Sequence, residues 1–156
     1  MEKLNRHMKL ILEINNLDSC KFSQKKLELI IAETIKRSPL GNFFKKNVLI
    51  SIAIVSEEEI RKINKKYRNK DSSTDILSFG DFNSIEELKN KKEEDIFLGE
   101  LLICCQDIEK YCKEKNIEFE REFSEVLSHG VLHLLGFDHT EEMFALQKSV
   151  ADYACA

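Results

Sequence analysis

Four apolar segments of the chain have the length and composition of β-strands. Residues 48–55 form a nearly continuous apolar run rich in β-branched side chains, and residues 96–103 form a second apolar run. Both runs are typical of buried strands. Two shorter segments, residues 10–14 and 75–79, also have strand character, and a pair of asparagines ends the first of them. The pattern therefore predicts a sheet of about four strands.

Helical spacing predicts two helices in the first half of the chain. Apolar residues between Leu27 and Ile35 follow an i, i+3, i+4, i+7, i+8 pattern, and Ser23 can cap the helix that carries them. Ser56 and Glu59 form a capping box, in which each side chain satisfies a backbone N–H near the start of a helix. We therefore expect the segment after each capping serine to be helical.

The second half of the chain alternates between polar and apolar segments. Residues 83–95 are charged and polar and are expected to form a solvated excursion. Residues 106–120 are highly charged and predict a solvent-facing helix. Residues 117–135 carry another helix, in which residues 126–135 are apolar except for Ser128, His129 and His133. Glu141 and Glu142 fit the first turn of a last helix, where acidic side chains interact favourably with the helix dipole.

These elements predict an α+β fold in a single domain that spans residues 1–156, with about five helices packed on one mixed sheet. The length suffices for one sizeable core. A hydrophobic content of 42% and a charged content of 33% fit a soluble globular protein. No apolar run approaches the length of a membrane span, and the N-terminus lacks the apolar region of a signal peptide. A cytoplasmic protein is therefore expected.

The chain has five cysteines, an odd number, and no CxxC pair. In a cytoplasmic protein they are expected to be reduced thiols. A thiolate metal site at Cys104, Cys105 and Cys112 is disfavoured, because these positions lack the spacing typical of zinc ligands.

Three of the four histidines lie within eleven residues. The spacing of His129 and His133 places both imidazoles on one face of a helix, one turn apart. Gly136 is expected to end that helix, so that the chain can turn back and bring His139 to the same point. A single histidine on such an apolar helix would usually be a core residue. Three converging imidazoles instead predict a zinc site with an open fourth position, which is the catalytic pattern.

The histidine spacing matches that of the metzincin proteases except at one position. Those enzymes carry a glutamate directly after the first histidine as the general base, and here that position is Gly130. A zinc peptidase is therefore a rival hypothesis, although the chain lacks the general base that such an enzyme uses. Glycine inside a helix costs about 1 kcal/mol relative to alanine. We expect Gly130 to open the site to a bulky substrate.

The other informative segment is basic. Residues 61–70 contain six basic residues and no acidic one, and Tyr67 lies among them. Basic residues around an aromatic ring suit phosphate contact and base stacking. The same charges are explained by a solvent-exposed helix face whose cations complement the helix dipole. On charge alone, this structural interpretation is favoured over nucleic-acid binding. The formal net charge of −4 does not exclude RNA binding, which depends on local clustering.

The two segments together resemble the YbeY family, bacterial rRNA maturation factors described as single-strand-acting endoribonucleases. Residues 129–139 are similar to the family signature H-G-x-L-H-L-x-G-Y-D-H. Residues 64–79 are similar to its pattern N-x-x-Y-R-x-x-D-x-x-T-D-V-L-S-F, and residues 98–101 to its L-G-D-I turn. Phe137 replaces the usual tyrosine and Glu100 replaces aspartate, and neither is a ligand position. The resemblance covers most of the chain.

The resemblance implies that His129, His133 and His139 hold one zinc ion and that Arg68 is the catalytic or phosphate-clamping arginine, in a cleft between the metal helix and the sheet. It implies a zinc-dependent endoribonuclease that acts on single strands in late ribosome maturation, processing the 16S rRNA 3′ end and serving ribosome quality control. RNA, namely rRNA of the small ribosomal subunit, is the expected substrate. Ribosomal or ribosome-assembly proteins are expected partners. Binding to DNA or to a membrane is not expected.

Three alternatives stay open at this point. The chain can be an assembly factor with a mainly structural zinc, although an open fourth position argues against a purely structural ion. Imidazole sites also accept nickel, copper and iron. The sequence does not identify a general base. A zinc-bound hydroxide would need none, and the RNA 2′-OH can instead be the nucleophile. Asp138 can act as the base or can orient an imidazole.

Overall fold

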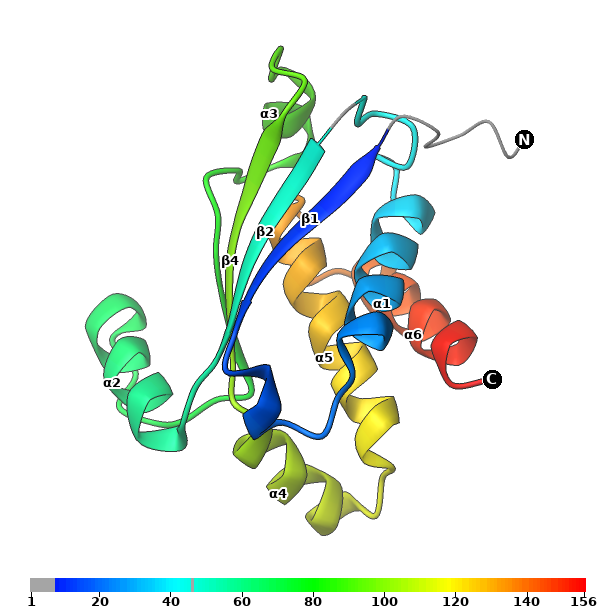
Figure 1. Cartoon of the computed structure of the whole chain (residues 1–156). Coiled ribbons are helices and arrows are strands. Elements are labelled where there is room, and N and C mark those ends of the chain that lie inside the picture. Colours follow the sequence, from blue (N-terminus) through cyan, green and yellow to red (C-terminus); the bar gives the residue numbers. More distant parts are fainter. Residues whose placement is uncertain (1–7, 46) are drawn as a thin grey trace.

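The computed structural model describes residues 8–45 and 47–156, which form one mixed sheet with helices on both faces (Figure 1). The strands, in the order β1-β2-β4-β3 across the sheet, are β1 (Lys9–Asn15), β2 (Asn47–Ile54), β4 (Ile96–Ile103) and β3 (Ile76–Phe79). β1, β2 and β4 are parallel, and β3 is antiparallel to β4. The predicted α+β fold with a mixed four-stranded sheet is confirmed.

The described helices are six α-helices and one short 3₁₀-helix: η1 (Leu17–Ser19), α1 (Gln24–Arg37), α2 (Glu57–Arg68), α3 (Ile85–Lys89), α4 (Cys105–Lys115), α5 (Phe119–Leu134) and α6 (Glu141–Ala154). The prediction missed α3, which lies in the segment expected to be an irregular excursion. Ser84 caps α3 by accepting a hydrogen bond from the Glu87 N–H, and Leu88 is fully buried. None of the described helices is long and apolar enough to cross a bilayer.

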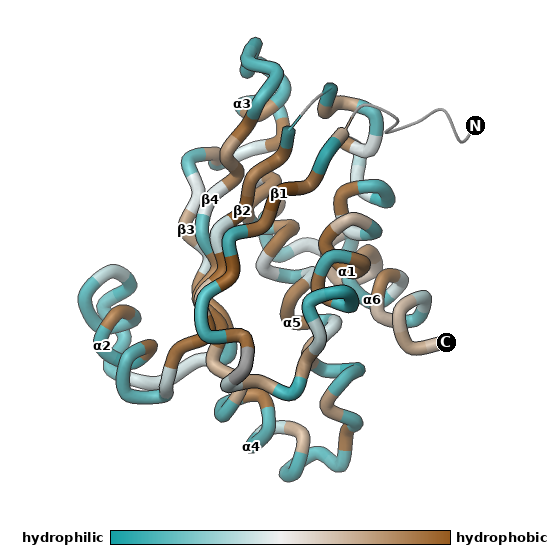
Figure 2. The backbone as a smooth tube through the Cα atoms, in the orientation of Figure 1, coloured by the Kyte–Doolittle hydropathy of each residue, from teal (hydrophilic) through white to brown (hydrophobic). Residues whose placement is uncertain are grey.

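The two faces of the sheet are covered differently. Helices α1, α5 and α6 pack together on one face, and α2 lies on the other side near one end (Figure 1). In β2 every second side chain is buried and the side chains between them are partly buried, so one face of the predicted strand packs against the core. Hydropathy follows this layout, since the strands and α5 are the most apolar elements whereas α2 and α4 are largely hydrophilic (Figure 2).

Helix α5 approaches β3 closely because position 130 is a glycine. A Cβ atom at Gly130 would lie 2.5 Å from Ile76 Cδ1 and 3.1 Å from Leu101 Cδ2. The Ser78 hydroxyl also donates a hydrogen bond of 3.2 Å to the Gly130 carbonyl. Gly130 is buried in this interface and does not line the cleft described below. The expectation that it opens the site to substrate is therefore wrong, and the glycine instead permits close packing of helix and strand.

Cys20 and Cys105 form a disulfide that links the segment before α1 to the start of α4. The expectation that all five cysteines are reduced is therefore wrong for this pair. Among the described residues, Cys104 and Cys112 are buried free thiols and Cys155 is an exposed one. Because Cys105 is bonded to Cys20, the thiolate site that the sequence disfavoured is excluded in this structure.

Candidate metal centre and its cleft

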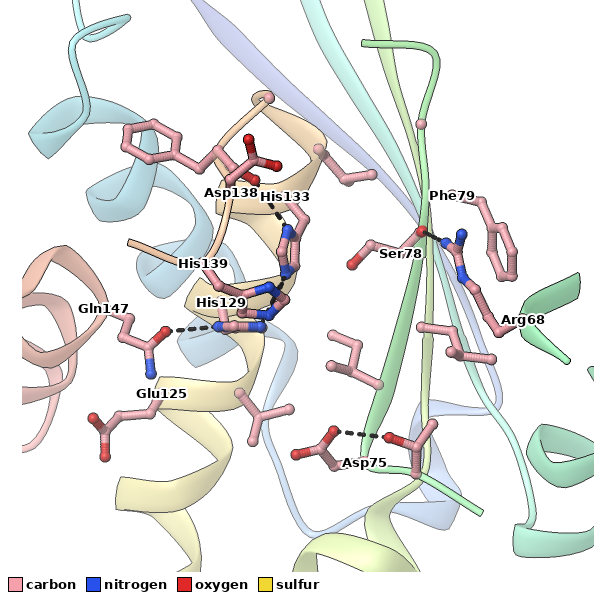
Figure 3. A pocket seen from close by; sticks show the side chains of 18 of the residues that line it. Arg68, Asp75, Ser78, Phe79, Glu125, His129, His133, Asp138, His139 and Gln147 are labelled. Atoms are coloured by element: carbon pink, nitrogen blue, oxygen red, sulfur yellow. Dashed lines mark hydrogen bonds between the residues drawn. The ribbon is translucent and has the colours of Figure 1, made fainter. Parts of the chain in front are cut away.

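Helix α5 and the turn after it bring three imidazoles together. His129 and His133 lie one turn apart on α5, and Gly136 adopts a left-handed φ of 96° just beyond the end of the helix. The chain then returns, so that His133 Nε2 lies 3.0 Å from His129 Nε2 and 3.3 Å from His139 Nε2 (Figure 3). The predicted convergence of the three histidines is confirmed, and this cluster has the geometry to hold a metal ion.

In His129 and His133, the ring nitrogen that faces away from the histidine cluster lies within hydrogen-bonding distance of an oxygen atom. His129 Nδ1 lies 2.8 Å from the Gln147 side-chain oxygen, and His133 Nδ1 lies 3.1 Å from the Phe137 carbonyl oxygen. Carbonyl oxygens only accept hydrogen bonds, so both rings carry their proton on Nδ1. Each Nε2 then presents a lone pair toward the other, 3.0 Å apart.

Two facing lone pairs repel unless a cation lies between them. Zinc–nitrogen bonds of 2.0–2.1 Å at tetrahedral angles separate two ligand atoms by about 3.3 Å, which matches the observed spacing. Burial lowers the pKa of His133, and the neighbouring His129 lowers that pKa further. The ring is therefore neutral at physiological pH, as a metal ligand must be. The donor set fits a divalent metal.

Asp138 does not orient the imidazoles. It is exposed and makes no hydrogen bond to the three histidines among the described residues. The orienting oxygens come instead from Gln147 on α6 and from the backbone of Phe137. The hypothesis that Asp138 holds an imidazole is therefore wrong.

Replacing Gln147 is expected to weaken metal binding without removing a ligand. Gln147→Leu should lower zinc affinity about 10- to 100-fold, because His129 loses the acceptor that fixes its tautomer and ring orientation. Affinity is measured by competition with a fluorescent chelator. Gln147→Glu is the matched control, since it keeps an oxygen acceptor and should bind zinc at least as tightly as the parent. Equal affinity of the leucine and parent proteins would contradict the assigned role.

The histidine cluster opens into a cleft of about 1080 Å³ between two walls. One wall carries the histidines, Glu125 and Gln147 on α5 and α6, and the other is formed by β3 and the end of α2 (Figure 3). Arg68 lines the second wall. Its Nη2 donates a hydrogen bond of 2.7 Å to the Ser78 carbonyl, and its guanidinium lies 4.9 Å from the Phe79 ring centroid. The structure thus brings the basic segment and the histidine motif to one cleft.

Comparison with known proteins identifies the family. The family described as Endoribonuclease YbeY matches residues 13–153. The chain belongs to the YbeY family. Endoribonuclease YbeY of Thermodesulfovibrio yellowstonii is 38% identical over 118 residues, which cover 74% of this chain and 70% of that protein. Endoribonuclease YbeY of Fusobacterium nucleatum is 35% identical over 141 residues, or 90% of this chain and 78% of that protein.

A solved structure agrees with this assignment. The solution structure of TM1509 from Thermotoga maritima matches with a TM-score of 0.56 and 27% identity, covering 92% of this chain and 89% of that one. The resemblance expected from the two sequence motifs is confirmed. Membership in the YbeY family makes the chain a metal-dependent hydrolase.

Several residues that line the cleft of this YbeY chain had not been predicted to belong to the site. Glu125 lies four residues before His129 on α5, so helical periodicity alone could have found it. Asp75 belongs to the family pattern at residues 64–79, whereas no motif in the sequence pointed to Tyr111, Glu122, Phe144 or Gln147. Burial raises the pKa of Asp75 and of Glu122, and Glu125 raises the latter further. Glu122 and Glu125 place carboxyl groups on the α5 wall beside the histidines, and Asp75 places one directly before β3.

Proposed function

We propose that this chain is an endoribonuclease that cleaves single-stranded RNA, with one zinc ion held by His129, His133 and His139. The observation that carries the proposal is the meeting of three imidazoles and Arg68 in one cleft. The family description, Endoribonuclease YbeY, supports RNA as the substrate. Zinc in this cage would lower the pKa of a bound water molecule and polarise a phosphoryl oxygen.

Arg68 is suited to hold the reacting phosphate. The hydrogen bond to the Ser78 carbonyl uses one of its five N–H donors and fixes the side chain, and the Phe79 ring supports the guanidinium plane. The remaining donors can form the planar, bidentate contact with phosphate oxygens that lysine cannot make. Arg68 is therefore assigned the stabilisation of negative charge that develops on the phosphate.

The segment beside Arg68 favours a nucleic acid over a peptide. Lys70 lines the cleft, and Lys65 and Lys66 lie on the last turns of α2. Tyr67 is 59% exposed, with the Lys66 ammonium 5.1 Å from its ring centroid. An exposed ring among cations suits a strand with phosphates and flat bases. This placement supports the nucleic-acid interpretation of the segment over that of a plain solvated helix face.

We also propose that the substrate is rRNA of the small ribosomal subunit, processed near the 16S rRNA 3′ end and in ribosome quality control. The chain would act in the cytoplasm as a single domain, beside ribosomal or ribosome-assembly proteins. These finer assignments rest on family membership.

The test uses zinc-loaded protein on precursor 16S rRNA, free and within ribosomal particles, with the new termini mapped by primer extension. Cleavage that stops on chelation with EDTA and returns with zinc is the expected result, because the imidazole cage supplies the reactive ion. Absence of cleavage by fully metallated protein in both contexts would refute the nuclease and favour the assembly-factor alternative.

A further inference from the structure

An exposed phenylalanine lies beside the histidine cluster. Phe144 on α6 lines the cleft and is 47% exposed, whereas its neighbour Met143 is fully buried in the core. Its ring centroid is 6.2 Å from those of His129 and His139, at interplanar angles of 24° and 34°. The ring therefore packs against the metal-site imidazoles and leaves part of its surface open to the cleft.

The charges around the cleft indicate which part of an RNA strand meets this ring. Among the described residues that line the cleft, the only arginine is Arg68 and the only lysine is Lys70. Both lie at the α2 end. The α5–α6 wall carries Glu125 instead (Figure 3), and Glu141 and Glu142 occupy the first turn of the helix that bears Phe144. Apart from the phosphate at the histidine cage, phosphates are therefore favoured at the α2 end of the cleft and disfavoured along the α5–α6 wall, where an uncharged, flat base fits.

We propose that Phe144 is a stacking platform for the base of a nucleotide next to the scissile phosphate. This inference rests on the proposed function and adds the source of single-strand selectivity. A base can stack on Phe144 only after it has left the stack of its own strand, so a base-paired duplex cannot occupy the subsite. Base–aromatic stacking is tolerant of sequence, and the subsite therefore accepts any of the four bases.

The test measures binding and not turnover. A short, fluorescein-labelled 2′-O-methyl oligoribonucleotide is titrated with zinc-loaded protein by anisotropy, with its integrity checked on a gel. Its bases are then removed one at a time as abasic sites. Phe144→Leu should weaken binding about tenfold, while Phe144→Tyr retains affinity. One abasic position should weaken binding to the parent by a similar factor and have no effect on binding to Phe144→Leu.

Tyr153→Leu is the matched control. Tyr153 lies on the same helix with the same exposure of 47%, but it contacts Arg37 and does not line the cleft. Its replacement should leave affinity unchanged. The proposal is overturned if Phe144→Leu binds the oligonucleotide like the parent. It is also overturned if Phe144→Leu loses zinc and still shows the full abasic penalty, because Phe144 would then only shield the histidines.

The stacking subsite and the nuclease can fail separately. Parent protein that shows the abasic effect but does not cut the corresponding RNA supports the subsite and refutes the proposed activity. RNA cleavage with no abasic effect at any position refutes the subsite alone.

Discussion

The His133→Ala protein is expected to lose zinc and RNA cleavage together. His133 Nε2 lies between those of His129 and His139, at 3.0 and 3.3 Å, so its removal breaks the cage at its centre. The loss of zinc affinity should exceed about 100-fold, the upper end of what removal of a mere orienting partner costs. Metal content is measured by mass spectrometry on the dialysed protein, and cleavage on single-stranded RNA.

Asp138→Ala provides the comparison for metal content. Asp138 lies in the same turn but is exposed and makes no hydrogen bond to the three imidazoles among the described residues, so this variant should retain zinc. Circular dichroism shows whether each variant is folded. A folded His133→Ala protein that holds one equivalent of zinc and cuts RNA would refute the assigned cage.

Arg68→Ala is expected to keep its zinc and its fold but to lose catalytic rate. The loss in kcat should be about 10²- to 10³-fold, as for the removal of a preorganised donor from other active sites. Arg68→Lys should recover part of the rate, because lysine retains the charge but not the bidentate geometry. Single-turnover cleavage of a short single-stranded RNA measures the effect.

Arg61→Ala is the matched control for Arg68. Arg61 lies on the same helix and is also exposed, but it is paired with Asp71 at 2.8 Å and does not line the cleft. Its replacement should leave the single-turnover rate near that of the parent. If Arg68→Ala cuts RNA at the parent rate, or if Arg61→Ala loses as much as Arg68→Ala, then the role given to Arg68 is wrong.

The histidine site was predictable because its geometry is local. A spacing of four residues on a helix places His129 and His133 on one face, and the glycine at position 136 permits the turn that returns His139. The strands were predictable for a similar reason, since apolar runs and the residues that end them lie close together in the sequence. The family motifs then linked Arg68 to the same site.

The remaining features depend on contacts between distant parts of the chain. Gln147 reaches His129 only because α6 packs beside α5, and no spacing rule joins these two positions. The Cys20–Cys105 disulfide spans 85 residues and connects elements that the fold alone brings together. Helix α3 is too short for its periodicity to be visible, although Ser84 was a capping signal within the polar segment.

The close approach of α5 to β3 also limits how this scaffold can be re-engineered. Restoring the metzincin glutamate by Gly130→Glu would direct a side chain into the buried interface against Ile76 and Leu101. One substitution therefore cannot convert this nuclease scaffold into a peptidase, although the histidine spacing is shared. The carboxyl groups that already line the cleft, such as those of Asp75 and Glu125, are the positions from which a proton acceptor can reach the substrate.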